Sequence, residues 1–321
     1  MSKLKKVKDK MLNSNNSCIR KMGKFIYRVV VKVSNSRIMY YLRCEPWLND
    51  KKYIIKQYKK KFGVKPNLII PKNFNEKNNW RKLYDRKEIY TLMVDKYKVK
   101  EVIREKCGEE YFVPLLGVWN KAKDIDFHVL PNKFVLKANH AGGVIVCRDK
   151  SVFDKKTAVK ELSEIQKRNY YYMSREWPYK NVKKKIICEQ YIGENLTDYK
   201  NYCFNGKLQY TFVWENKSRE DGRKPAAYFC GAYDREWKKT SIDIDYPSKN
   251  EVISKPDKYD EMIKIAEKMS KDIPFVRVDC YIVNNRIYIG ELTFFPWGGF
   301  QKFNDKVWND YLGDLEVLPI E

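Results

Sequence analysis

The pattern of apolar and polar positions along the chain changes near Pro131. After this residue, short apolar runs bounded by turn residues predict β-strands. The last two runs flank Asn284-Asn285, a dipeptide typical of the tight turn in a β-hairpin. Strands joined in this way indicate antiparallel sheet. The predicted strands span residues 134–137, 144–147, 186–191, 201–204, 208–214, 227–229, 276–283 and 286–293.

Apolar residues three and four positions apart predict helices before and between these strands. Residues 45–123 have a largely helical pattern, interrupted by a short stretch of strand character at 68–70. Two further helices are predicted at 157–168 and 257–271. Helices laid across antiparallel strands predict a protein of the α+β class.

The first 43 residues are densely basic, and Asp9 is their only acidic residue. Between residues 25 and 33, apolar side chains recur at helical spacing among lysines and arginines. This pattern suits a short amphipathic helix that lies on an anionic membrane surface. It suits equally well an ordinary helix that packs on the body of the protein.

The whole chain of 321 residues carries 65 Lys and Arg against 41 Asp and Glu, a formal charge of +24 that attracts anions. Three kinds of partner fit this charge: nucleic acid, an acidic membrane surface, and an acidic small molecule or polymer. The sequence contains no zinc-finger spacing, RNA-binding strand motif or basic heptad array. We therefore expect no nucleic-acid partner.

The composition also bears on which cellular compartment contains the protein. Hydrophobic residues make up 43% of the chain, which is enough for a sizeable core. No apolar run is long enough to cross a membrane, and no apolar stretch of a secretory signal follows the basic start. The eight cysteines form no CxxC pair, which argues against a disulfide framework or structural zinc. We expect a cytoplasmic protein, peripheral at the inner face of the membrane if the basic segment binds lipid.

A lysine and a glycine-containing turn stand together in the segment FVLKANHAGG, residues 134–143. The segment begins as an apolar strand, reaches Lys137 and turns at Gly142 and Gly143 before the next strand. A glycine loop can fold over phosphate groups and donate backbone N–H bonds, while a lysine supplies a point charge to the phosphate oxygens. The alternative is a solvated lysine beside an ordinary hairpin turn.

Two carboxylates stand in the apolar strands of the last predicted hairpin, Asp279 before its turn and Glu291 after it. A carboxylate is costly in such a strand unless a cation neutralises it. With a strict two-residue turn, residue 279 pairs with residue 290, and the two carboxylates lie on opposite faces. A β-bulge or a three-residue loop pairs 279 with 291 and brings both carboxylates onto one face. We predict the second register.

This register has consequences for the chemistry of the hairpin. Two carboxylates on one face provide the hard oxygen ligands that Mg²⁺ takes together with phosphate oxygens and water. Arg277 and Thr293 follow onto the same face by the two-residue alternation of a strand. Four further residues are expected on that face: Tyr281, Val283, Ile287 and Ile289.

A third segment, residues 186–207, runs from an apolar strand through a glycine-containing turn into a second strand. The first strand ends in Glu189, Gln190, Tyr191 and Ile192, and the second begins with Asp198 and Lys200. Main-chain groups at the end of a strand can bind the edge of a purine, and a nearby carboxylate can accept hydrogen bonds from ribose hydroxyls. Taken alone, the segment is an ordinary hairpin.

Taken in order, these segments resemble an ATP-grasp enzyme. The matching pieces are Asp95-Lys96, Lys137 with the glycine loop, EQYI at residues 189–192, R-x-D at Arg277 and Asp279, and E-x-T at Glu291 and Thr293. Other stretches resemble the TupA-like branch of that superfamily, named for teichuronopeptide biosynthesis. They are KLYDRKEIYTLMVDKYKVKEVI (82–103), FVPLLGVW (112–119), SREWPYKN (174–181), DYKNYCFNGK (198–207) and ELTFFPWGGF (291–300). The resemblance covers roughly residues 70–305.

The resemblance implies an ATP-grasp fold, in which two α+β subdomains grip ATP and the glycine loop forms a lid. It implies four parts: a basic N-terminal extension, a helical region, a lid subdomain, and a C-terminal subdomain with the metal site. The expected boundaries are residues 1–43, 44–130, 131–192 and 193–321.

The resemblance also implies how ATP is bound. The phosphates are held by Lys96 and Lys137 and covered by the lid loop with His140, Gly142 and Gly143. Adenine is bound by the main chain of Gln190, Tyr191 and Ile192, with Glu189 at its amino group and Asp198 at the ribose.

The resemblance further implies two Mg²⁺ ions on Asp279 and Glu291, with Arg277 neutralising the transferred phosphoryl group. The family usually has Asn two residues after the Glu, where this chain has Thr293. A hydroxyl lacks the amide carbonyl, so the second ion would depend more on Glu291 and phosphate. Lys200 is a further candidate contact for phosphate or a substrate carboxylate.

Such an enzyme is a carboxylate–amine ligase that works through an acyl phosphate, a task that asks for positioning and charge neutralisation. The branch is associated with cell-surface polysaccharides. The resemblance therefore implies a uronic-acid carboxylate, as in an acidic glycan, and an amino acid or small amine. Two other classes of function stay open: a glycosyltransferase that binds a nucleotide sugar through a metal, and a non-catalytic basic module that binds anionic polymer.

Overall fold

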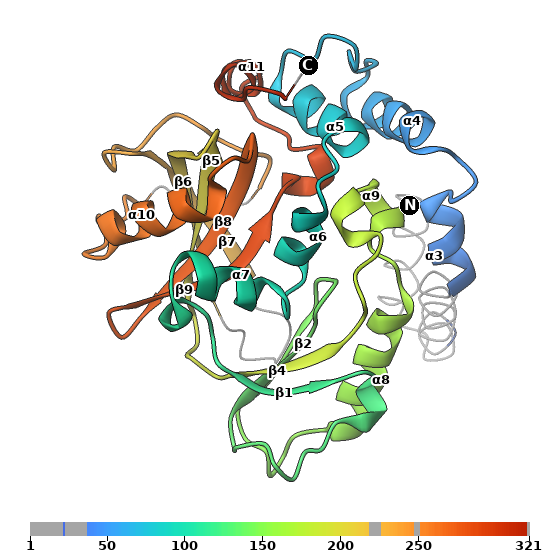
Figure 1. Ribbon diagram of the computed structural model, residues 1–321, viewed down its shortest axis with the longest axis vertical. Coiled ribbons are helices and arrows are strands. Elements are labelled where there is room, and N and C mark those ends of the chain that lie inside the picture. The colour runs from blue at the N-terminus through green and yellow to red at the C-terminus, as the bar shows by residue number, and fades with distance from the viewer. Residues whose placement is uncertain (1–21, 23–36, 218–225, 247–250, 320–321) are drawn as a thin grey trace. The chain divides into compact units, whose positions relative to one another are not determined.

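The computed structural model describes Met22 and residues 37–217, 226–246 and 251–319. The chain divides into two compact units, residues 1–49 and 50–321. In the first unit the structure describes helix α3 (Arg37–Cys44), and the helix predicted within residues 25–33 lies outside the described residues. All the predicted site residues belong to the second unit (Figure 1).

The smaller sheet of the second unit has four antiparallel strands in the order β1-β4-β2-β3. Its strands are β1 (Leu115–Trp119), β2 (Phe134–Ala138), β3 (Val144–Cys147) and β4 (Ile186–Gln190). Phe134, Leu136 and Ala138 are buried in a core with helix α8 (Lys155–Lys167). Because side chains alternate along a strand, Lys137 lies on the other face of this sheet.

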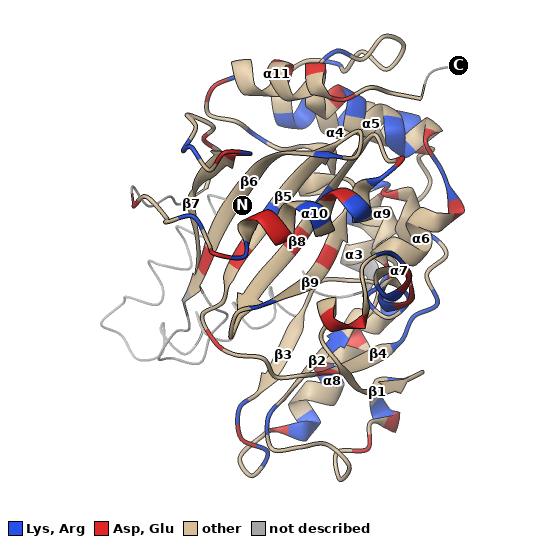
Figure 2. Cartoon of the chain, turned by 60° about the vertical axis from the view of Figure 1, so that its left-hand side comes forward, with Lys and Arg blue, Asp and Glu red and all other residues tan. Residues whose placement is uncertain are grey.

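The larger sheet has five strands in the order β7-β6-β5-β8-β9, all of them antiparallel to their neighbours (Figure 1). Its strands are β5 (Thr197–Phe204), β6 (Lys207–Lys217), β7 (Ala226–Asp234), β8 (Phe275–Val283) and β9 (Arg286–Thr293). Helix α10 (Tyr259–Ser270) packs on one face, where Met262 and Met269 share a core with Val278. The strands of this sheet are mostly uncharged in Figure 2, and some of their charged residues, on β5, β8 and β9, form part of the site described below.

The remaining helices surround the two sheets. They are α4 (Asp50–Phe62), α5 (Phe74–Tyr84), α6 (Glu88–Val94), α7 (Val99–Lys106), α9 (Tyr171–Ser174) and α11 (Val307–Leu315). Short 3₁₀ segments lie at η1 (Glu109–Tyr111), η2 (Ala122–Asp124), η3 (Trp177–Tyr179) and η4 (Pro296–Gly299). Helices with two antiparallel sheets confirm the predicted α+β class.

Two of the predicted elements before Pro131 need correction. Residues 68–70 form no strand, because the side chain of Asn67 accepts hydrogen bonds from the main-chain N–H groups of Ile69 and Ile70 and turns the chain there. Strand β1 lies in the stretch predicted as largely helical. It is an edge strand with every residue half-buried, so it shows no alternating pattern in the sequence.

The register predicted for the last hairpin is confirmed. Asp279 pairs with Glu291, and Arg277 pairs with Thr293. Asn284 and Asn285 have φ of 50° and 59°, the left-handed conformation that a tight hairpin turn requires. The two-residue turn and the 279–291 pair are compatible because a bulge at Gly290 adds one residue to β9.

Because of the same bulge, the prediction that Ile287 and Ile289 share the face of Asp279 is wrong. Ile287 and Ile289 pair with Ile282 and Cys280, so they lie on the face covered by α10, opposite Asp279. The alternation of β9 is shifted at Gly290, and residues before the bulge therefore change sides. Tyr281 and Val283 keep the predicted face, because β8 itself has no bulge.

Candidate active site

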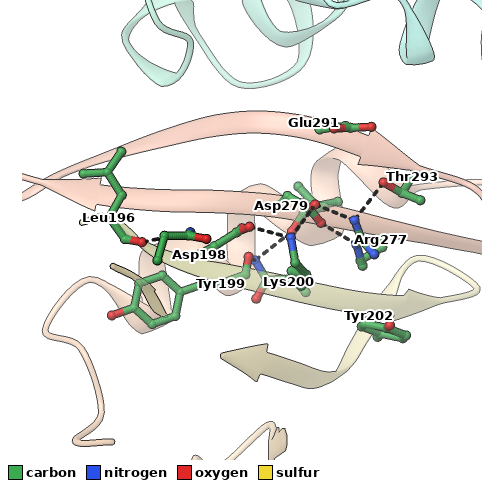
Figure 3. Close-up of polar contacts among 12 residues, drawn as sticks. Leu196, Asp198, Tyr199, Lys200, Tyr202, Arg277, Asp279, Glu291 and Thr293 are labelled. Carbon is green, nitrogen blue, oxygen red and sulfur yellow. Dashed lines mark hydrogen bonds and ion pairs between the residues drawn. The ribbon is translucent and has the colours of Figure 1, made fainter. Parts of the chain in front are cut away.

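Six polar residues lie together on the face of the larger sheet that α10 leaves open. Each comes from one of three adjacent strands, where cross-strand pairing aligns Lys200 with Asp279 and Asp279 with Glu291. Figure 3 shows contacts that join Asp198, Lys200, Asp279, Arg277 and Thr293 along the sheet, with Glu291 on the neighbouring strand. We call them the acidic–basic cluster: Asp198, Lys200, Arg277, Asp279, Glu291 and Thr293.

Asp279 is the centre of this cluster. Nε and Nη2 of Arg277 each donate a hydrogen bond of 2.6 Å to its two carboxylate oxygens, and Lys200 Nζ lies 3.1 Å from Oδ2. Burial alone would raise the pKa of Asp279, but the charges of Arg277 and Lys200 hold it below its usual value. Asp279 is therefore ionised at neutral pH.

Lys200 links the second carboxylate of the cluster to the first. Its Nζ lies 2.5 Å from Oδ2 of Asp198. Burial raises the pKa of Asp198, and the attraction of Lys200 offsets only part of that effect. Oδ1 of Asp198 is buried and has no hydrogen-bond partner in the described part of the protein.

Glu291 and Thr293 are held more loosely. Nη2 of Arg277 donates to Thr293 Oγ1 at 3.1 Å, while the carboxylate of Glu291 is 35% exposed. Lys96, which follows helix α6, lies with its Nζ 3.6 Å from Oε2 of Glu291. Glu291 is thus the carboxylate of the pair that is more open to a ligand.

Two lysines surround Glu189 of the smaller sheet, Lys137 from β2 and Lys100 from α7. Lys137 Nζ lies 2.5 Å from one carboxylate oxygen of Glu189, and Lys100 Nζ lies 2.7 Å from the other. Burial would raise the pKa of Glu189, but the two lysines hold it below its usual value. Lys100 was not predicted as a site residue, because its position in a basic helix gives no sign of burial in the sequence.

A cleft of about 430 Å³ runs between Lys137 and the β8–β9 hairpin. Lys137 and Glu189 line one side, and Tyr281 and Gly290 line the other. The connection between the two sheets closes its end with Gln190, Tyr191, Ile192, Glu194 and Leu196. Glu194 was not predicted, and it is bonded to Arg148 Nε at 2.5 Å.

The glycine loop between β2 and β3 borders this cleft at Gly143, whose φ of 110° favours glycine. A buried Asn139 anchors the loop, since its Nδ2 donates to Asp95 Oδ1 and its carbonyl accepts from the N–H of Lys96. The motif Asp95-Lys96 is therefore tied directly to the loop.

Two predicted residues of this loop lie elsewhere. Burial lowers the pKa of His140 to about 4, so its ring is neutral at pH 7, and it does not line the cleft. Gly142 also lies outside the lining of the cleft, with open space where a Cβ would stand. Gly143 is the residue of the three that borders it.

A second cavity, of about 310 Å³, adjoins the cleft, and Asn216 lines both. We call it the side cavity. Asp198, Lys200 and Arg277 line it, so the structure directs Asp198 into the side cavity and away from the cleft where the ribose contact was predicted. A larger cavity of about 700 Å³, lined by Lys100 and Arg286 among others, contains none of the predicted site residues.

The oxygen atoms of the hairpin fit Mg²⁺ by their chemistry. Asp279 and Glu291 are cross-strand neighbours on one face, with the Thr293 hydroxyl beside them. Among the described residues, no group of three or more acidic, histidine or cysteine side chains could enclose a cation. An ion held here would complete its shell with phosphate and water, as Mg²⁺ commonly does.

Two antiparallel sheets, packed with helices and separated by a cleft, have the architecture of the ATP-grasp class. The chain belongs to the TupA-like ATP-grasp family, whose family model matches residues 76–317. This match confirms the predicted family and fold. A comparison with curated proteins found no match.

Solved structures of ATP-grasp ligases are similar to part of the chain. D-alanine–D-alanine ligase from Helicobacter pylori is 16% identical over 77% of this chain and 69% of its own, with a TM-score of 0.43. L-amino acid ligase from Bacillus licheniformis is 10% identical over 77% of this chain and 55% of its own, also with a TM-score of 0.43. D-alanine–D-alanine ligase from Bacillus anthracis is 17% identical over 63% of this chain, with a TM-score of 0.38, and this chain spans only 57% of its length.

Proposed function

We propose that this protein is an ATP-dependent carboxylate–amine ligase that works through an acyl phosphate. The observation that carries the proposal is the pairing of Asp279 with Glu291 on one face of the β8–β9 hairpin. Tyr281 and Gly290 of this hairpin line the cleft opposite Lys137, although Asp279 and Glu291 are not among its lining residues. Paired acidic ligands opposite a phosphate-binding lysine suit phosphoryl transfer, in which catalysis is mainly positioning and charge neutralisation.

ATP would lie in the cleft. Lys137 and Lys96 supply positive charge to the phosphates, and the loop at Gly143 covers them. The main chain of residues 190–192 borders the cleft at the end of β4 and is our candidate to bind adenine. The N–H of Gln190 donates to the carbonyl of Pro114, so the donor to adenine would come from Tyr191 or Ile192. Glu194 lines the cleft and replaces Asp198 as our candidate for the ribose hydroxyls.

Asp279, Glu291 and Thr293 would hold Mg²⁺, which when bound neutralises charge on the phosphate oxygens. Arg277 lies beside the same carboxylates, at 2.6 Å from Asp279. It is therefore placed to stabilise negative charge that develops on the transferred phosphoryl group. Lys200 is placed to orient the carboxylate that attacks.

The proposed reaction has two steps. A substrate carboxylate oxygen forms a bond to the γ-phosphorus of ATP while the bond from that phosphorus to ADP breaks, giving an acyl phosphate. A neutral amine nitrogen then bonds to the acyl carbon, the bond from that carbon to phosphate breaks, and the nitrogen loses one proton. The products are an amide, ADP and inorganic phosphate, and no protein nucleophile is required.

For the substrates, we propose a uronic-acid carboxylate and an amino acid or small amine, in the biosynthesis of a cell-surface polysaccharide. The net charge of +24 supports an acidic glycan as partner. Among the described residues, no helix is both long and apolar enough to span a bilayer. We propose that the basic segment 1–43 holds a cytoplasmic enzyme at the anionic inner face of the membrane. A chain that begins at residue 44 should then lose binding to phosphatidylglycerol liposomes but keep its turnover.

The test of the enzymatic proposal is a screen for ADP release over uronic acids crossed with amino acids, in the presence of Mg²⁺. Lys137→Ala and Glu291→Gln should each lower the rate at least about 100-fold, because each removes charge from the phosphate site. The matched controls are Lys156→Ala and Glu161→Gln on the exposed face of α8, which should leave the rate unchanged.

Two outcomes would contradict the proposal. Unchanged rates in Lys137→Ala and Glu291→Gln would remove both residues from the mechanism. Stabilisation of the fold by ATP and Mg²⁺ without turnover on any pair of acid and amine would favour the non-catalytic module.

A further inference from the structure

The side cavity has an aromatic wall. Trp214 and Tyr246 meet edge to face with ring centroids 4.7 Å apart, and Tyr246 lies 5.8 Å from Trp297. All three rings line the cavity, and the Trp297 side of the row is open, since this residue is 51% exposed. The negative face of an aromatic ring attracts polarised C–H groups, so such a wall suits a flat or ring-shaped ligand with C–H bonds on its faces.

The same cavity contains two buried polar atoms without a partner in the described part of the protein. They are the donor Trp214 Nε1 and the acceptor Asp198 Oδ1. Trp214 and Asp198 are a cross-strand pair of β6 and β5, so their side chains lie next to each other on one face of the sheet. Buried polar groups are normally bonded. A hydroxyl group is the ligand that satisfies both, because it accepts one hydrogen bond and donates another.

Positive charge lines the inner end of the cavity. Two contacts of the Lys200 ammonium are to carboxylates, Asp198 and Asp279, which leaves one of its three N–H groups for a ligand. Arg277 lines the cavity next to Lys200 and also contacts Thr293, within the proposed phosphoryl-transfer site. A ligand carboxylate bound by Lys200 and Arg277 would lie beside Thr293 and Asp279 of the proposed phosphoryl-transfer site.

Trp297 is held in place at a cost. Its φ of 54° and ψ of 30° are left-handed, a conformation that is strained for a bulky residue. The next two residues fix this conformation, because Lys82 Nζ donates to the carbonyl of Gly298 and Asn79 Nδ2 donates to that of Gly299 at 2.6 Å. Strain that buried side chains maintain around a half-exposed ring is typical of a ligand-binding residue.

We propose that the side cavity binds the pyranose ring of a sugar acid. The ring stacks on Trp297, one of its hydroxyl groups bridges Trp214 and Asp198, and its carboxylate points to Lys200 and Arg277. A cavity of about 310 Å³ is at the small end of the range of about 300–1,000 Å³ for small-molecule sites, which suits a single sugar ring. This inference rests on the proposed function, since it assigns the position of that reaction's carboxylate substrate.

Titration calorimetry with three probes, in the presence of ADP and Mg²⁺, tests the inference. Methyl glucuronide has the ring and the carboxylate, gluconate has the carboxylate and hydroxyls without a ring, and methyl glucoside has the ring without the carboxylate. We expect the full-length protein to bind methyl glucuronide at least about tenfold more tightly than either of the others. Trp297→Ala should weaken that binding at least about fivefold.

Two further variants separate the ring contacts from general effects. Trp214→Phe removes only the indole N–H from an otherwise similar side chain, and we expect about three- to tenfold weaker binding of methyl glucuronide. Tyr84→Ala removes another half-exposed aromatic ring, outside the cavity, and should bind all three probes as the wild type does.

The outcomes distinguish this inference from the proposed function. Gluconate binding as tightly as methyl glucuronide, no binding of any probe, or full binding by Trp297→Ala would overturn the inference. Thermal stabilisation by ADP and Mg²⁺, measured on the same samples, reports on the nucleotide site independently of the sugar. Its absence, together with no ADP release on any acid, would overturn the proposed function instead.

Discussion

Two regions of this protein bury several charged side chains, and they differ in what those charges face. The first is the acidic–basic cluster. The second surrounds helix α5, and we call it the α5 network: Asn75, Asn79, Arg81, Lys82, Asp85 and Glu316. Arg81, Lys82 and Glu316 are more completely buried than Asp279, and Asp85 is buried to about the same extent.

The α5 network faces the protein itself. Arg81 lies 3.3 Å from both Asp85 and Glu316, and Asn75 Nδ2 donates to the carbonyl of Gln301 at 2.8 Å. Lys82 stacks over the ring of Phe300 at 4.4 Å. These contacts secure the segment that follows β9 and carries Trp297. Three residues of the acidic–basic cluster, by contrast, line the side cavity: Asp198, Lys200 and Arg277.

Burial of charge therefore does not by itself distinguish a binding site from a network of contacts that only stabilises the fold. Both regions also contain buried polar atoms without partners among the described residues, such as Arg81 Nη2 in the network and Asp198 Oδ1 in the cluster. The difference is the adjoining cavity. A free polar atom beside a cavity can be satisfied by a ligand, whereas one in packed protein is a cost to stability.

The largest expected effect is on stability, in the α5 network. Arg81→Leu leaves Asp85 and Glu316 without their shared cation and should lower the free energy of unfolding by about 3–5 kcal/mol. The matched control is Arg104→Leu on α7, where the arginine is 55% exposed and 3.6 Å from Glu109. It should cost about 0–1 kcal/mol. Urea denaturation measures the free energy of unfolding of both variants. Equal losses would show that Arg81 contributes no more to stability than an exposed arginine.

The second-largest expected effect is a pH dependence of the stability that the α5 network contributes. Burial raises the pKa of Glu316 to about 7, from about 4.5 in the unfolded chain. The folded state therefore keeps a proton that the unfolded state loses between these values. The stability from this group is fully present below pH 4.5 and is lost as the pH rises to about 7.

Glu316→Gln should remove this dependence. Relative to the variant, the wild type should lose about 1–3 kcal/mol of unfolding free energy between pH 5 and pH 8, as measured by denaturation at both values. Glu164→Gln is the control of opposite sign. A hydrogen bond from Lys167 lowers the pKa of this exposed carboxylate, so its small contribution is lost toward acid pH. A pH response of Glu316→Gln identical to that of the wild type would contradict the assignment.

The hairpin of the cluster could be predicted from sequence because local rules determine it. Asn284-Asn285 fixes the turn, and the need to neutralise two carboxylates in apolar strands selects the bulged register. The bulge residue Gly290 has a further reason to be glycine, since a Cβ there would lie 2.5 Å from the ring of Tyr281. The sequence could not show that the bulge moves Ile287 and Ile289 to the other face, because that depends on which strand contains it.

The α5 network could not be predicted, because its burial depends on distant partners. The segment FNEKNNWRKLY has the composition of a solvated surface helix. Its polar side chains are buried because main-chain carbonyls of residues 294–301 and the carboxylate of Glu316, more than 200 positions away, pair with them. Strand β1 and Lys100 were missed for the same reason: their environment comes from β4, about 70 or more residues further along the chain.

The smallest expected effect concerns Thr293, where the change should alter rate without altering stability. Thr293→Val keeps the β-branched shape but removes the oxygen that accepts a hydrogen bond from Arg277 at 3.1 Å. The loss of one such bond corresponds to about 0.5–1.5 kcal/mol, or roughly a two- to tenfold lower rate of ADP release. Thr293→Ser retains the hydroxyl and should stay close to the wild type, with the free energy of unfolding checked for both variants.

A loss above about 100-fold in Thr293→Val alone would mean that this oxygen binds the metal directly. Equal rates in the two variants would show that the oxygen has no part in orienting Arg277, and the cluster would then resemble the α5 network at this position.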